Sequence, residues 1–287
     1  MEPTRTGAGE APARIYIGTD PSQMVAAKVF EYSVRRHATM PVAFDTMDSV
    51  TWPFPSDPKN QPRTNFSFHR FAIPKLAGYE GRAAYVDADM IVFRDIRELW
   101  EIPFNDATVL YAPSSNPKRT KQFSVMLMDC SRLRWDVDAI IGGMDEGRYD
   151  YDQLVGELCI EPDSDVQARI PPEWNSLDLF FPGKTGLLHY THMETQPWVY
   201  SRHKHGDLWV ASLQDAISEG AISRKEVEEA VERGWARPSL LRQLDTERSR
   251  WPLFNRLTAP IIDRGFKPHR ALRERQAQVN KQAAPTP

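Results

Sequence analysis

The chain has 287 residues, of which 41% are hydrophobic and 26% charged, a composition typical of folded globular proteins. The formal net charge of −3 argues against a general nucleic-acid binder, and no apolar run is long enough to cross a bilayer. Residues 1–13 are polar and contain two Pro and two Gly, so we expect a disordered N-terminus without a secretory signal.

The first two thirds of the chain alternate between strand and helix patterns. Short apolar runs predict buried strands at residues 15–17, 42–44, 83–86, 90–93, 108–112, 123–128, 167–170 and 186–190. Apolar residues at helical spacing predict helices at residues 21–37, 65–76, 95–100, 131–141 and 151–158. Pro74 predicts a break near the end of the second helix. This alternation predicts an α/β fold with a mainly parallel sheet and helices on both faces.

The pattern changes after about residue 209. Three helical patterns, at residues 213–220, 224–234 and 238–244, follow one another without a strand between them. Residues 264–287 contain four Arg and two Lys against a single acidic residue, and residues 282–287 have the composition of a disordered tail. We therefore predict an α/β domain at residues 14–211 and a helical, basic C-terminal extension at residues 212–287.

Two carboxylates, Asp87 and Asp89, follow directly after the predicted strand at residues 83–86. Ligands of parallel α/β folds bind at the carboxyl ends of the strands. Two neighbouring anions are costly there unless a cation neutralises them. Carboxylate oxygens suit Mg²⁺ or Mn²⁺, which also bind substrate phosphates. The pair therefore indicates a metal site, and a solvated turn is the alternative that the pattern leaves open.

Three segments, residues 68–74, 85–92 and 95–100, carry motifs in a fixed order. They contain an Arg followed four residues later by Pro, then Tyr-Val-Asp-Ala-Asp, then Asp-Ile-x-x-Leu-Trp. This combination resembles glycosyltransferase family 8, and the resemblance extends from about Arg14 to Trp198. It implies a GT-A fold, a Rossmann-like mixed sheet flanked by helices that binds nucleotide-sugars. It also implies an enzyme that uses Mn²⁺ or Mg²⁺ and retains the anomeric configuration.

The resemblance implies that Asp87, Asp89 and His189 bind the metal. His189 matches the histidine of the family's closing motif, which continues here to Pro197-Trp198. Two carboxylates and one imidazole are a reasonable ligand set for Mn²⁺, with open positions for phosphate oxygens. Without the family pattern, a core histidine bonded to a backbone carbonyl is the competing interpretation.

Further roles are implied for the donor and for the reaction centre. Thr19 and Asp20 match the loop after the first strand, whose acidic residue contacts the nucleobase. Arg70 matches the helix arginine that reaches the sugar or the phosphate of the donor. Asp152 and Gln153 match the pair that lies beside the reactive carbon of the sugar, and they are the expected catalytic residues.

The chain departs from the family pattern at the closing motif. Gln196 stands where the family has a lysine near the diphosphate, and the spacing from His to Trp is one residue longer. A positive charge for the diphosphate must then come from elsewhere, with Arg70, Arg202 and Lys204 as candidates. We therefore expect a divergent member of the family.

These assignments predict a retaining transferase. It moves a hexose from a nucleotide-sugar, with UDP-glucose or UDP-galactose as expected donor, to a hydroxyl of a glycan, a glycolipid or a small acceptor. We expect attack on the face from which the diphosphate departs, with Asp152 and Gln153 stabilising the oxocarbenium-like centre; Asp152 as a nucleophile is the alternative. Two other classes stay open: a haloacid dehalogenase-type phosphohydrolase that uses Asp87, and an inactive glycan-binding relative.

The C-terminal segment mixes apolar and basic side chains. The apolar ones are Trp251, Leu253, Phe254, Leu257, Ile261, Ile262 and Phe266, and Arg and Lys lie between them. This composition suits an interfacial segment on anionic lipid. In the alternative, the apolar residues pack on the preceding domain, which Pro252, Pro260 and Pro268 favour by breaking a long helix. We expect a cytoplasmic protein, with peripheral contact with the inner face of the membrane as a candidate interaction.

Overall fold

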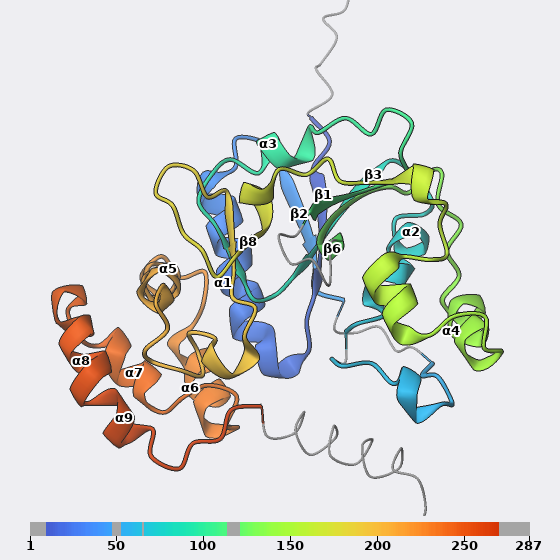
Figure 1. Cartoon of the computed structure of the whole chain (residues 1–287). Helices are drawn as coiled ribbons and strands as arrows, with labels where there is room; N and C mark the ends of the chain where they lie inside the picture. The colour runs from blue at the N-terminus through green and yellow to red at the C-terminus, as the bar shows by residue number, and fades with distance from the viewer. Residues whose placement is uncertain (1–9, 48–52, 65, 114–120, 270–287) are drawn as a thin grey trace, which may run out of the picture.

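The computed structural model describes residues 10–47, 53–64, 66–113 and 121–269 (Figure 1). Its centre is a six-stranded sheet in the order β2-β1-β3-β6-β5-β7. The strands are β1 (Ala13–Gly18), β2 (Val42–Asp45), β3 (Arg82–Asp87), β5 (Val109–Pro113), β6 (Lys121–Asp129) and β7 (Val166–Gln167). Strand β6 pairs antiparallel with β3 and with β5, while the other pairings are parallel. The predicted α/β fold with a mixed sheet is confirmed.

The antiparallel strand of this mixed sheet is β6. Only seven residues separate the end of β5 from the start of β6. A parallel neighbour needs a crossover of a dozen or more residues, so this short connection returns the chain in the opposite direction.

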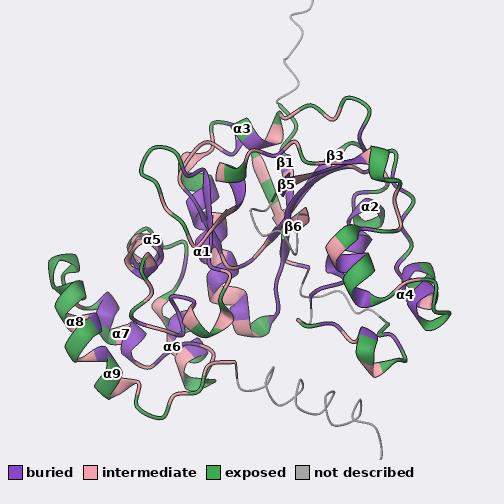
Figure 2. Cartoon of the chain, viewed as in Figure 1, coloured by how far each residue is buried: buried purple, intermediate pink, exposed green. Residues whose placement is uncertain are grey.

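Helices cover both faces of this sheet, because alternate side chains of each strand point to opposite sides. On one face, Tyr16 and Tyr85 share a core with residues of α2 (Ile73–Leu76) and α4 (Val137–Asp145). On the other face, Ile17 and Val86 share a core with residues of α1 (Met24–His37) and α3 (Arg97–Trp100). Figure 2 shows the buried residues concentrated in the strands and on the inner sides of these helices.

A second, three-stranded sheet follows the order β4-β9-β8. Its strands are β4 (Met90–Val92), β8 (Ser176–Leu177) and β9 (Leu187–His189). Ile91 and Leu188 of this sheet belong to a third core, with residues of α1 and of the C-terminal helices. These helices are α5 (Gly206–Ser218), α6 (Arg224–Glu232), α7 (Ser239–Leu244), α8 (Trp251–Leu257) and α9 (Ala259–Ile262), which lie together at one side of the molecule (Figure 1). The predicted division at residue 211 falls inside α5.

Three predicted helices are shorter than expected. The pattern at residues 131–141 becomes α4, which begins only at Val137 because Asp136 caps it and accepts a hydrogen bond from the Ala139 N–H. Residues 151–158 contain one five-residue π-helix, η4 (Gln153–Glu157), which ends where Leu158 adopts φ +57°. Residues 65–76 contain a 3₁₀ turn, η3 (His69–Ala72), and then α2.

The helical pattern changes next to Pro74, where η3 ends at Ala72 and α2 begins at Ile73. Pro74 lies in the first turn of α2, where its missing N–H leaves no hydrogen bond unmade.

The predicted disordered segments lie largely outside the described residues, which exclude residues 1–9 and 270–287. Within the described part, Glu10 forms an ion pair with Arg97, and Ala13 begins β1. The described helices include none with the length and apolar character that a bilayer span requires.

Candidate active site

Three of the predicted site residues meet where the two sheets join. Asp87 ends β3, Asp89 lies just before β4, and His189 ends β9. Met90 pairs with His189 in the antiparallel register of β4 and β9, and the Tyr190 N–H donates to the Asp89 carbonyl over 2.9 Å. One ligand atom from each of the three residues lies within 4.8 Å of the others.

The carboxylate of Asp89 is held from two sides. Its Oδ2 accepts a 2.7 Å hydrogen bond from Gln196 Nε2, and its Oδ1 lies 3.2 Å from His189 Nε2. Oδ1 is buried and has no hydrogen bond of good geometry from any described residue. Two carboxylates and one imidazole with an unsatisfied buried oxygen fit a Mn²⁺ or Mg²⁺ ion.

The environment of Asp87 combines burial with partial neutralisation. Tyr85 Oη donates to Asp87 Oδ1 over 2.6 Å, and Arg70 Nη2 lies 3.8 Å from the same oxygen. Burial raises the pKa of Asp87, and the negative charge of Asp89 adds to the rise, although Arg70 opposes both. This crowding of negative charge is what a divalent cation would relieve.

His189 faces the same two carboxylates. Burial alone would lower the pKa of His189, but the adjacent Asp89 and Asp87 outweigh burial and raise it. The residue is 6% exposed, so it is not a surface histidine, and its Nδ1 lies 3.0 Å from Asn175 Oδ1, so its partner is a side chain and not a backbone carbonyl. A proton on Nε2 and a cation would compete for the position next to Asp89.

Thr19 and Asp20 lie next to this cluster. Strands β1 and β3 are parallel, with Gly18 opposite Asp87, and the Ala88 N–H donates to the Gly18 carbonyl over 3.1 Å. Both residues are buried. Asp20 Oδ1 accepts hydrogen bonds from the N–H and the hydroxyl of Ser22, at 2.8 and 2.5 Å, and so caps η1 (Pro21–Gln23).

Arg70 is buried rather than extended into solvent. Its Nη1 donates to the Phe123 carbonyl over 2.8 Å, and its guanidinium lies 4.6 Å from the centre of the Tyr85 ring. Its nearest charged partner is Asp87. Lys204 lies in an exposed turn before α5 and makes no contact with the cluster within the described chain.

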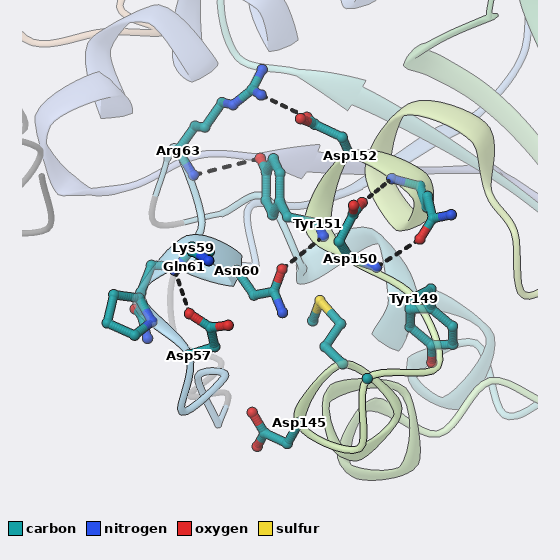
Figure 3. Close-up of a pocket in the computed structure, with 14 residues that line it drawn as sticks. Asp57, Lys59, Asn60, Gln61, Arg63, Asp145, Tyr149, Asp150, Tyr151 and Asp152 are labelled. Atoms are coloured by element: carbon teal, nitrogen blue, oxygen red, sulfur yellow. Dashed lines mark hydrogen bonds and ion pairs between the residues drawn. The ribbon is translucent and has the colours of Figure 1, made fainter. Parts of the chain in front are cut away.

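Asp152 and Gln153 lie in a separate polar pocket of about 730 Å³ (Figure 3). Asp152 Oδ1 forms a 2.6 Å ion pair with Arg63, whose guanidinium lies 5.3 Å from the centre of the Tyr151 ring. Gln153 and Asp150 exchange two hydrogen bonds of 2.8 and 2.9 Å between backbone and side chain. No hydrogen bond or ion pair joins Asp152 or Gln153 to the Asp87 cluster within the described residues.

The pocket and the cluster are linked through η3. Tyr151 lines the pocket, its Oη donates to Ser67 over 3.0 Å, and its ring meets the Phe68 ring edge-on with the ring centres 5.8 Å apart. Ser67 and Phe68 directly precede η3, which carries Arg70.

Sequence reasoning missed three residues that hold the cluster. Tyr85 was assigned only to a buried strand, although its spacing of two from Asp87 places both side chains on one face. The sequence marks Gln196 only as a departure from the family pattern, and no motif described above includes Asn175. Both amides contact the predicted metal ligands.

Similar solved structures identify the class of fold. The glycosyltransferase GlyE of Streptococcus pneumoniae TIGR4 aligns with a TM-score of 0.55 at 14% identity, over 79% of this chain and 65% of GlyE. The galactosyltransferase LgtC, solved with donor and acceptor sugar analogues, aligns with a TM-score of 0.53 at 11% identity, over 73% of this chain and 100% of LgtC. The predicted GT-A fold of glycosyltransferases is thereby confirmed.

A sequence comparison agrees with this fold. Residues 21–137 match the model of glycosyl transferase family 8. Protein CDI of Arabidopsis thaliana is 32% identical over an alignment of 101 residues that covers 32% of this chain and 37% of the length of that relative. The predicted resemblance to this family is confirmed over residues 21–137.

Proposed function

We propose that the protein transfers a hexose from a nucleotide-sugar to an acceptor hydroxyl with retention of anomeric configuration. The observation that carries this proposal is the meeting of Asp87, Asp89 and His189 at the junction of the two sheets. The family match over residues 21–137 supports a transferase over a phosphohydrolase that uses Asp87 as nucleophile.

Asp87, Asp89 and His189 would hold a Mn²⁺ or Mg²⁺ ion. The ion would supply positive charge to the diphosphate as it departs. The residues themselves fit this role because Asp89 Oδ1 is buried without a donor among the described residues. The two carboxylates also lie close together, with Arg70 beside Asp87.

The donor would lie along the carboxyl edge of β1 and β3. Thr19 and Asp20 follow β1 and would contact the nucleobase. The expected donor is a UDP-hexose, either UDP-glucose or UDP-galactose. Gln196 is buried against Asp89, so Arg70 and the exposed Lys204 are the candidate cations for the sugar and the diphosphate. Arg70 already offsets the charge of Asp87, which favours a role next to the phosphates.

Asp152 and Gln153 would act at the reacting carbon from the polar pocket of Figure 3. The carboxylate of Asp152 is exposed, and its ion-pair partner among the described residues is the exposed Arg63, so it can turn toward a bound sugar. We favour attack by the acceptor on the face that the diphosphate leaves, with a diphosphate oxygen accepting the proton. Asp152 and Gln153 would then stabilise positive charge at the sugar carbon.

We propose that the protein is cytoplasmic and that its C-terminal helices contact the surface of the membrane. Trp251 is buried, and its Nε1 donates to the carbonyls of Gln243 and Thr246, so it belongs to the core. Leu253, Leu257 and Ile261 are 60, 52 and 75% exposed and follow at spacings of four residues. These three side chains, with Arg256 exposed beside them, are the part of the segment that could meet lipid.

A direct test incubates the full chain with a panel of nucleotide-sugars and Mn²⁺ and measures release of nucleoside diphosphate, with and without sugar acceptors. We expect release from one UDP-hexose, a product of retained configuration, and a loss of at least about 10²-fold in Asp89→Asn. Undiminished turnover in excess EDTA would contradict the metal assignment.

Two other outcomes of this assay point to the alternative functions. Hydrolysis of a phosphate ester that depends on Asp87 would favour the phosphohydrolase. Tight binding of a glycan without release of diphosphate from any donor would favour an inactive relative.

A further inference from the structure

We propose that Asn175 and Gln196 are positioning residues of the metal centre. Asn175 fixes the ring tautomer of His189, and Gln196 fixes the carboxylate of Asp89. The inference rests on the proposed function for the metal and extends it to two neutral amides, one of which stands where the family has a charged lysine.

Asn175 holds the side of the His189 ring that faces away from Asp89. It ends η6 (Pro172–Asn175) and is buried. Its Nδ2 donates to Ser124 Oγ over 3.1 Å, so its Oδ1 faces His189 Nδ1 at 3.0 Å. A carbonyl oxygen only accepts, so Nδ1 carries the proton, and the neutral ring then presents its lone pair at Nε2.

Gln196 holds Asp89 from the opposite side of the cluster. It is fully buried and directly follows η7 (Met193–Thr195). Its Nε2 donates to Asp89 Oδ2 over 2.7 Å and to the Tyr190 carbonyl over 3.2 Å. Both partners can only accept, so the orientation of the amide is determined. With Oδ2 occupied, Oδ1 is the oxygen left to face His189 Nε2 at 3.2 Å.

The two amides together leave one oxygen and one nitrogen free, side by side, for a cation. They do so without adding charge. A lysine in place of Gln196 would offset the charge of Asp89, whereas an amide orients the carboxylate and leaves its full charge for the ion. Residues that orient metal ligands in this way affect metal affinity about 10- to 100-fold when they are replaced.

The test measures Mn²⁺ affinity of the full chain without nucleotide, by calorimetry and by the electron paramagnetic resonance signal of free Mn²⁺. We expect Asn175→Leu and Gln196→Met to weaken Mn²⁺ binding about 10- to 100-fold. Asn175→Asp keeps an acceptor for Nδ1–H and should bind within about 3-fold of the native chain. Gln214→Met, which removes an amide of α5 far from the site, is the matched control and should bind as the native chain does.

The outcomes separate this inference from the proposed function. If the native chain binds no Mn²⁺ or Mg²⁺, the metal centre itself is wrong. If the native chain binds Mn²⁺ and Asn175→Leu, Asn175→Asp and Gln196→Met all bind equally well, the positioning roles are wrong and the proposed function stands. Thermal unfolding checks each fold, and Asn175→Ser, which also removes the amide acceptor, replaces the Leu variant if that variant does not fold.

Discussion

Gly18 leaves the space that the side chain of Tyr85 occupies. A β-carbon on residue 18 would overlap the Tyr85 hydroxyl, which donates the 2.6 Å hydrogen bond to Asp87. Gly18 lies opposite Asp87 in the parallel register of β1 and β3. The missing side chain on one strand therefore sets the position of a carboxylate on its neighbour.

We expect Gly18→Ala to lower the free energy of unfolding by about 1–3 kcal/mol, because Tyr85 is fully buried and cannot move away without strain. Mn²⁺ affinity should fall with it, since Asp87 loses its hydroxyl donor. Urea denaturation and calorimetry measure the two effects. Gly142→Ala in α4 is the control: a β-carbon there meets no atom within 4 Å, so the change should be neutral or slightly stabilising. Equal behaviour of the two variants would contradict the close contact.

The role of Asp20 can be separated from its capping of η1. Asn caps a helix start about as well as Asp, so Asp20→Asn should unfold at the same temperature as the native chain. If the carboxylate accepts a hydrogen bond from the base, Asp20→Asn should weaken UDP binding, and Asp20→Ala should weaken it by about 1–3 kcal/mol. Calorimetry with UDP and GDP measures this. Tighter binding of GDP than of UDP would overturn the assignment of the nucleotide.

Glu226 makes stability depend on pH. It closes a capping box with Ser223 and pairs with Lys28 of α1. Burial opposes its ionisation, but Lys28 and Ser223 lower its pKa from 4.5 to about 2. A lowered pKa stabilises the folded state above pH 4.5, and this contribution is lost as the pH falls to about 2.

We therefore expect Glu226→Gln to cost about 1 kcal/mol at pH 7, a small value because the pair is partly exposed. The difference from the native chain should shrink between pH 4.5 and pH 2. Urea denaturation across this range measures it. Glu228→Gln removes an exposed pair with Arg224 and should change stability by less than about 0.5 kcal/mol. If the difference in free energy of unfolding does not change with pH, the charge of Glu226 does not contribute to stability.

Exposed apolar residues of α8 and α9 give the membrane proposal a specific test. The full chain should co-sediment with anionic vesicles at low salt, and serine at Leu253, Leu257 and Ile261 together should abolish this. Leu76→Ser, at an exposed leucine of α2, is the control. Removing the segment is a poorer test, because it also removes the buried Trp251. If the native chain ignores the vesicles, the three residues have no role at lipid.

Local patterns in the sequence were sufficient for the strands around the site. The Asp-x-Asp motif lies at the end of β3, as predicted, and His189 lies beside it, as the family pattern implied. Both motifs occur where strands end, so they indicate the strands as well as the chemistry. Helix starts were less predictable. The helix α4 begins only at Val137 because Asp136 caps it, although the apolar pattern starts several residues earlier.

Contacts between distant parts of the chain could not be predicted from one sequence. Gln196 and Asn175 reach the cluster because η7 and η6 place them beside it, and no periodicity encodes that packing. The separation of Asp152 from Asp87 is of the same kind. The roles of the predicted site residues, and the division of the chain at residue 211, remain predictions.

The three candidate ligands come from two different sheets. Asp87 ends a strand of the six-stranded sheet, whereas His189 belongs to the three-stranded sheet and Asp89 borders it. An ion held by all three would be released by any unfolding that separates the sheets, so occupancy and folding are coupled. By mass action, Mn²⁺ at 100 times its dissociation constant would add about 2.7 kcal/mol to the free energy of unfolding. The resistance of the protein to heat and proteolysis would then vary with the divalent metal supply of its cell.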